Sequence, residues 1–149
     1  MRIGEFCNRE VVVIEEERSV TEAAVIMREY HVGDVVIVRE EYGKQVPVGI
    51  LTDRDIALGI VANGTDPDSV CVGEAMSSEL TTVTEDDDLM HVIEVMRENG
   101  IRRVPVTDSE QTLVGILTVD DVLDLLSEVL IDLAHLVDRQ RRRETRARP

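Results

Sequence analysis

Aromatic side chains are scarce in this sequence, which has two Tyr, one Phe and no Trp among its 149 residues. A hydrophobic core must therefore be built from Val, Ile, Leu, Ala and Met, and the hydrophobic content of 43% suits a soluble globular chain. Proteins that hold single-stranded nucleic acid commonly stack its bases on aromatic rings. The near absence of such rings argues against that function.

Cysteine and long apolar runs are also scarce. Cys7 and Cys71 form no disulfide framework, and no run approaches the ~18 apolar residues of a membrane span. The first residues lack the apolar stretch of a secretory signal peptide. His31, His91 and His135 have no ligand-like spacing to the cysteines, so we predict no metal site. We expect a cytoplasmic protein without a membrane span.

Lysine is nearly absent, whereas acidic residues are abundant, and the formal net charge is −15. Residues 139–149 hold six Arg and one Glu, a charge of +5; the other 138 residues hold ten basic and thirty acidic side chains, a charge of −20. A body of that charge repels phosphate backbones, so the sequence argues against nucleic acid as a partner.

The sequence contains an internal repeat. With a shift of 69 residues, Ile3-Gly4-Glu5 falls on Val72-Gly73-Glu74; with a shift of 66, residues 48–52 fall on 114–118. A repeat of this length indicates one supersecondary unit built twice. We predict two repeats, 3–71 and 72–128, related by a pseudo-twofold axis with a cleft between them.

Hydrophobic patterns and turn residues predict the same element order in each repeat: strand, helix, strand, strand, helix. The first repeat has predicted strands at 11–14, 35–38 and 46–51, a helix capped by Ser19 and ended by Gly33, and a helix over 52–61. The second has strands at 80–83, 103–106 and 113–117, a helix over 88–99 ended by Gly100, and a helix from 118. Short helical lead-ins are expected at 3–6 and 72–76. The fold class is α/β (α+β).

The last helix is too long for its repeat. Apolar residues recur at alternating spacings of four and three, which is the pattern of a coiled-coil seam: Val119, Leu123, Leu126, Leu130, Leu133 and Val137. We therefore predict a helical extension over 129–138 and at least a homodimer. The basic tail, 139–149, is expected to be disordered.

The sharpest local motif is Gly-x-x-Thr-x-x-Asp, which occurs at 49–55 and again at 115–121. Thr52 with Asp55, and Thr118 with Asp121, can form helix N-caps that need no ligand. A carboxylate at this place can instead accept the two hydroxyls of a ribose, near helix N–H groups that suit phosphate. The pattern alone allows both interpretations, and one side chain can serve both.

The doubled motif, the element order and the stretch 101–106 resemble a tandem pair of cystathionine-β-synthase (CBS) domains, stand-alone in type. The resemblance covers residues from about 3 to 128. It implies two repeats packed through their sheets, dimerisation, and an adenosine-type ligand (AMP, ADP, ATP or S-adenosylmethionine) bound between the repeats. It implies no obligatory cofactor and no catalysis.

The resemblance also assigns roles to residues of this sequence. Asp55 and Asp121 hold ribose in the family, with Thr52 and Thr118 beside them. Arg102 and Arg103 stand where relatives place phosphate-binding residues, and guanidinium groups suit phosphate oxygens.

The first repeat departs from this pattern, because Gly33 and Asp34 occupy the positions of the two arginines. Asp34 would repel phosphate, and Arg54 could compensate. We therefore predict unequal sites, with tighter binding around Thr118, Asp121 and the two arginines.

The family lines its adenine pocket from the segments before and into the first strand, which are Cys7–Val12 and Met76–Thr81 here. Val12 and Thr81 belong to these segments, and Val32 and Ile101 are the expected apolar walls.

Three functions are compatible with the sequence. The first is a regulatory module that binds an adenosine-type ligand and signals to a partner protein; no Ser/His/Asp arrangement, metal cluster or phosphate loop of the Gly-x-x-x-x-Gly-Lys kind indicates an enzyme. The second is a structural or interaction protein in which both Thr-x-x-Asp motifs are only caps. The third is nucleic-acid binding through the arginine tail.

Overall fold

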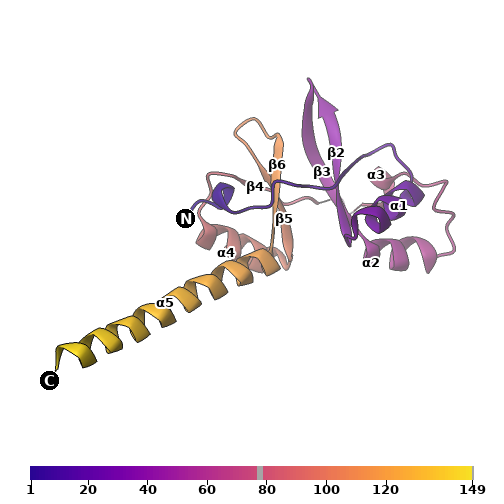
Figure 1. Cartoon of the computed structure of the whole chain (residues 1–149). Helices are drawn as coiled ribbons and strands as arrows, with labels where there is room; N and C mark the ends of the chain where they lie inside the picture. The colour runs from indigo at the N-terminus through magenta and orange to yellow at the C-terminus, as the bar shows by residue number, and fades with distance from the viewer. Residues whose placement is uncertain (77–78, 149) are drawn as a thin grey trace. The chain divides into compact units, whose positions relative to one another are not determined.

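Both repeats fold in the predicted element order, as Figure 1 shows for a computed structural model that describes residues 1–76 and 79–148. The first repeat comprises η1 (Ile3–Glu5), β1 (Val13–Glu15), α1 (Val20–Tyr30), β2 (Asp34–Glu41), β3 (Lys44–Thr52), α2 (Asp53–Asp55) and the π-helical segment η2 (Ile56–Val61). The second comprises α3 (Val72–Ala75), β4 (Val83–Thr84), α4 (Leu89–Asn99), β5 (Arg103–Thr107), β6 (Leu113–Thr118) and α5 (Val119–Ala147). The chain divides into two compact units, Met1–Leu117 and Thr118–Pro149.

Helix α1 begins at the predicted capping box. The Ser19 hydroxyl accepts from the Glu22 N–H at 3.1 Å, and the Glu22 carboxylate accepts from the Ser19 N–H at 3.1 Å. The helix ends earlier than predicted, because His31 and not Gly33 takes the left-handed conformation, with φ of 54°. Gly100 ends α4 as predicted, with φ of 62°.

Two three-stranded sheets, ordered β1-β2-β3 and β4-β5-β6, form the framework. In the first sheet β1 runs parallel to β2, and β3 pairs antiparallel with β2 along its whole length. Pro47 lies on β3, which is an edge strand, and an edge tolerates its missing N–H.

The two sheets pack on each other, as the resemblance implies. Val36 and Val38 of β2 form one buried cluster with Ile116 of β6, and each of the three is at most 8% exposed. A separate cluster fills the space between the first sheet and its helices, with Leu51, Val20 and Val72 fully buried. Burial of this aliphatic surface supplies the main favourable term in folding.

The lead-in segments are exchanged between the repeats. The Gly4 N–H donates to the Glu85 carbonyl at 2.9 Å, and the Gly73 N–H donates to the Glu16 carbonyl at 3.0 Å. A shift of 69 residues relates these two hydrogen bonds, so they are equivalent in the two repeats. Each repeat therefore depends on the other for part of its structure.

The side chain of Glu16, whose carbonyl accepts from the Gly73 N–H, is held by Arg39. It accepts from the Arg39 Nε at 2.8 Å and from an Arg39 Nη at 3.1 Å. These hydrogen bonds lower the pKa of Glu16. Because the pKa of Glu16 is lower in the folded state, its interaction with Arg39 stabilises the fold above the unfolded-state pKa. This stabilisation is lost as the pH falls through the folded-state pKa.

Helix α5 begins at the predicted capping box of Thr118 and Asp121 and is longer than predicted. It continues to Ala147, through the segment that we expected to be disordered. Arg is a good helix former, and the segment has local support: Arg142 pairs with Asp138 at 3.2 Å, and the Thr145 hydroxyl donates to the Arg141 carbonyl at 2.9 Å. Among the described residues, no helix has the length and the apolar character that crossing a membrane requires.

We expect deletion of residues 139–149 to leave folding and ligand affinity nearly unchanged. The described residues of this segment are exposed, and the segment lacks the apolar periodicity needed to join a core. Any docking by its charge would be screened over about 8 Å at physiological salt. The test compares melting temperatures of the full chain and the truncated chain at low and high salt. A loss of several degrees that persists at high salt would show specific packing of the segment.

Candidate functional site

Five of the predicted ligand-binding residues line one cavity of about 310 Å³ within Met1–Leu117. They are Thr52, Thr81, Ile101, Arg102 and Arg103, and the remaining lining residues are Ile50, Glu79 and Leu80. Thr52 and Ile50 come from the first repeat, whereas the other six come from the second. The cavity therefore lies between the repeats.

Strand ends bring these residues together. Ile50 and Thr52 close β3, Glu79–Thr81 precede β4, and Ile101–Arg103 connect the end of α4 to β5. The cavity combines an apolar part with two guanidinium groups, two threonine hydroxyls and the Glu79 carboxylate. A few convergent polar groups on an apolar lining are typical of small-molecule sites. Arg102 and Arg103 line this cavity together with Thr52. Their predicted association with Thr118 stays a prediction.

Thr52 and Asp55 form the helix cap that the motif predicts. The Thr52 hydroxyl accepts from the Asp55 N–H at 3.0 Å, and the Asp55 carboxylate accepts from the Thr52 N–H at 3.0 Å. The Arg54 N–H donates to the Asp53 carboxylate at 2.8 Å. These three N–H groups already donate hydrogen bonds within the helix cap, so they are not available to a phosphate. Asp55 and Arg54 are exposed, and neither lines the cavity.

Arg103 forms an ion pair with Asp34, with 2.6 Å between an Nη and an Oδ. The two residues occupy equivalent positions in the two repeats, and their side chains are only 30% and 25% exposed. From the sequence, Asp34 is expected to belong to a separate first-repeat site. The structure instead pairs it with Arg103, so Asp34 offsets part of the positive charge of the cavity lined by Arg103.

The remaining first-repeat candidate, Val12, lines a different cavity of about 680 Å³ together with Glu10, Glu29, Tyr30 and Val32. Glu10, Val12 and Val32 are the equivalents of Glu79, Thr81 and Ile101. The two cavities thus use equivalent positions of the two repeats but differ in charge. Among the described residues, two carboxylates and no arginine line the first-repeat cavity.

Thr118 and Asp121 lie in the unit Thr118–Pro149 and form the same capping box. The Thr118 hydroxyl accepts from the Asp121 N–H at 3.1 Å, and the Asp121 carboxylate accepts from the Thr118 N–H at 3.0 Å. A ligand-binding role for the pair stays a prediction. Within the predicted segment Met76–Thr81, Ser77 and Ser78 lie outside the described residues.

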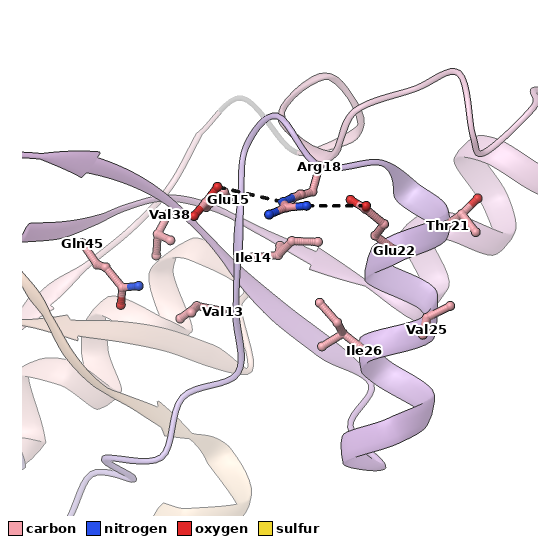
Figure 2. Close-up of a pocket in the computed structure, with 10 residues that line it drawn as sticks. All are labelled: Val13, Ile14, Glu15, Arg18, Thr21, Glu22, Val25, Ile26, Val38 and Gln45. Carbon is pink, nitrogen blue, oxygen red and sulfur yellow. Dashed lines mark ion pairs between the residues drawn. The ribbon is translucent and has the colours of Figure 1, made fainter.

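A further cavity, of about 470 Å³, lies beside α1 and contains no predicted site residue (Figure 2). Arg18 stands between Glu15 and Glu22, at 3.9 and 3.7 Å. The walls are mainly aliphatic, with Ile14 and Ile26 among them. Because two carboxylates flank Arg18, which is the one cation among the described lining residues, this cavity is poorly suited to an anionic ligand. In the described ranges, no group of three or more Cys, His, Asp or Glu side chains could hold a metal ion.

The fold and the repeated motif have their counterpart in a known family. The family model of the CBS domain matches residues 3–62 and 72–128, and the chain belongs to this family. The resemblance found in the sequence is confirmed.

Individual relatives support the same assignment. An uncharacterised protein of Methanopyrus kandleri is 37% identical over 83% of this chain, which spans 61% of that relative's length. Hypoxic response protein 1 of Mycobacterium tuberculosis is 35% identical in sequence, and the match covers 83% of this chain and 84% of that protein. The crystal structure of Hypoxic Response Protein I with two coordinated zinc ions has a TM-score of 0.73 at 31% identity. That structural match covers 83% of this chain and 98% of the other. The CBS domain pair of protein MJ0100, in complex with 5′-methylthioadenosine and S-adenosylmethionine, has a TM-score of 0.72 at 29% identity, covering 86% of this chain and 97% of that one.

Proposed function

We propose that this protein is a non-catalytic regulatory module that binds an adenosine-type ligand in the cavity lined by Thr52 and Ile101–Arg103. The observation that carries the proposal is that Thr52, from the Thr-x-x-Asp motif of one repeat, lines the same cavity as the two arginines of the other repeat. The ligands of MJ0100, methylthioadenosine and S-adenosylmethionine, support the ligand class. The regulated partner is a protein that senses occupancy of this cavity.

Within the proposed site, each group has a chemical role. Ile50, Leu80 and Ile101 provide apolar surface for an adenine ring. Asp55 does not line the cavity in the present conformation; its role is to accept hydrogen bonds from ribose hydroxyls after a change of rotamer that releases its carboxylate from the Thr52 N–H. Arg102 and Arg103 donate to the anionic end of the ligand, in the manner of bidentate guanidinium–phosphate contacts.

Among adenosine ligands, the charge of the cavity favours AMP over ATP. Asp34 already pairs with Arg103, and the Glu79 carboxylate stands in the same lining. A triphosphate would bring three to four negative charges to two arginines and two carboxylates, whereas AMP brings about half as many. A volume of about 310 Å³ is also at the low end for small-molecule pockets, which are about 300–1,000 Å³.

We expect Asp34→Asn to tighten AMP binding by about tenfold, since removal of a carboxylate from the Arg103 guanidinium is worth roughly 1.4 kcal/mol at this range. Adenosine, which lacks the phosphate, should bind with unchanged affinity. Titration calorimetry with both ligands is the test. Equal changes for AMP and adenosine, or weaker binding of AMP, would show that the ion pair positions the site and does not compete with the ligand.

Thermal unfolding with a ligand panel tests the proposal as a whole. AMP, ADP, ATP, NAD and S-adenosylmethionine are added separately to the full chain. A ligand at a hundred times its dissociation constant adds about 2.7 kcal/mol to the free energy of unfolding. If none of them raises the melting temperature, the structural or interaction function is favoured, because both capping boxes are complete without a ligand.

A further inference from the structure

Helix α5 carries a broad apolar face that is exposed in the single chain. Eight of its large apolar side chains are between 41% and 66% exposed: Leu123, Leu126, Val129, Leu130, Ile131, Leu133, Leu136 and Val137. All but Ile131 lie on one side of the helix at heptad spacing. Monomeric soluble proteins rarely expose a continuous apolar surface of this length. The face is therefore suited to a partner helix.

The charges of α5 are segregated along its length. Between 119 and 138 there are six acidic residues and no Lys or Arg, whereas 139–148 hold six Arg and one Glu. The apolar face ends where the basic part begins, at Val137. Arg141 continues the line of that face, because it follows Val137 by four residues. A helix that pairs with α5 must accommodate both an acidic end and a basic end.

We propose that the partner of the α5 face is α5 of a second copy of this chain, in antiparallel orientation. With the chains antiparallel, the basic end of each helix lies beside the acidic end of the other. With the chains parallel, twelve arginines would gather at one end and the acidic residues at the other, which is destabilising. Charge complementarity thus selects one orientation of the second copy.

The heptad pattern also sets the register. When Leu130 of one copy packs against Leu133 of the other, Leu126 lies opposite Val137, and the apolar faces overlap along their length. Arg141 then lies beside the first turn of the partner helix, which contains Asp120 and Asp121. The apolar side chains on either side of the seam pack between the seam residues, as they do in an antiparallel coiled coil.

Sedimentation of the full chain is the first test. The expected mass is twice 16.7 kDa or a multiple of it. Leu130→Glu with Leu133→Glu places four carboxylates at the centre of the seam, and we expect the dimer to weaken by about a hundredfold or more. Ile131→Glu is the matched control, since Ile131 is on the same helix and 55% exposed but outside the face. A monomer at micromolar concentration, or a dimer that survives the double substitution, would overturn the proposal.

Disulfide trapping determines the orientation. In a Cys71→Ala background that keeps the buried Cys7, two proteins are made, one with Leu126→Cys and one with Val137→Cys. We expect mixed disulfides when the two are combined, and little self-linking of Val137→Cys, because antiparallel pairing separates its two copies. Self-linking of Val137→Cys without mixed disulfides would show a parallel pair and refute the proposed orientation. High salt should lower the mixed yield, since it screens the paired charges.

Discussion

Gly4→Ala is expected to lower the free energy of unfolding by about 1–3 kcal/mol. A Cβ at this position would lie 2.8 Å from the Glu85 carbonyl oxygen and 2.9 Å from the Glu85 Cβ. Neither neighbour is the far end of a flexible side chain, so the exchanged lead-in must shift. The shift would weaken the hydrogen bond from the Gly4 N–H to Glu85, which joins η1 to the second repeat.

Gly59→Ala is the matched control for this prediction. No heavy atom lies within 4 Å of a Cβ built at Gly59, and its φ is not in the left-handed region. Its replacement should be neutral, or stabilising by about 0.4–1 kcal/mol through the unfolded chain. Urea unfolding of both variants measures the difference. Equal stabilities for Gly4→Ala and Gly59→Ala would mean that the exchanged lead-in contributes nothing measurable to the fold.

Asp55→Ala should weaken AMP binding at least about tenfold, because hydrogen bonds to a charged carboxylate contribute roughly 1.5–3 kcal/mol. Asp121→Ala removes an equivalent cap from an equivalent motif, so the two variants lose similar helix stability. A difference in AMP affinity between them therefore reports on the ligand and not on capping. Titration calorimetry at matched temperature makes the comparison.

The sequence alone favoured Asp121, because it assigned the arginines to the site of the second repeat. The structure brings Arg102 and Arg103 together with Thr52, and we therefore expect the larger effect at Asp55. A loss of AMP affinity confined to Asp121→Ala would instead support the site around Thr118 and Asp121 that the sequence predicts. Similar losses in both variants would indicate that both motifs hold ligand.

Local signals in the sequence predicted most of the fold. The capping boxes at Ser19, Thr52 and Thr118, and the left-handed Gly100, depend on residues within one helical turn. The internal repeat extended each local assignment to its counterpart, which is why the element order of both repeats was predicted. The end of α1 was misplaced because His31 tolerates the left-handed conformation that Gly33 would adopt more readily.

Particular contacts between the repeats were not predicted from the sequence. The exchanged lead-ins and the Asp34–Arg103 ion pair join residues that are 57 to 81 positions apart, and no local pattern indicates such a pairing. The equivalence of positions 34 and 103 was a signal that could have been used, since residues near a pseudo-twofold axis meet their own counterparts. An aspartate and an arginine at equivalent positions are therefore candidates for an ion pair and not only for two unlike sites.

The most direct test of the proposed function is an amide chemical-shift map of the full chain titrated with AMP. The proposal predicts saturable shifts at Thr52, Thr81, Ile101 and Arg102, with the residues of the 680 Å³ cavity, such as Val12 and Tyr30, unaffected at the same AMP concentration. Saturable shifts centred on Val12 and Tyr30, or no saturable shift up to the solubility limit of AMP, would contradict the proposed function.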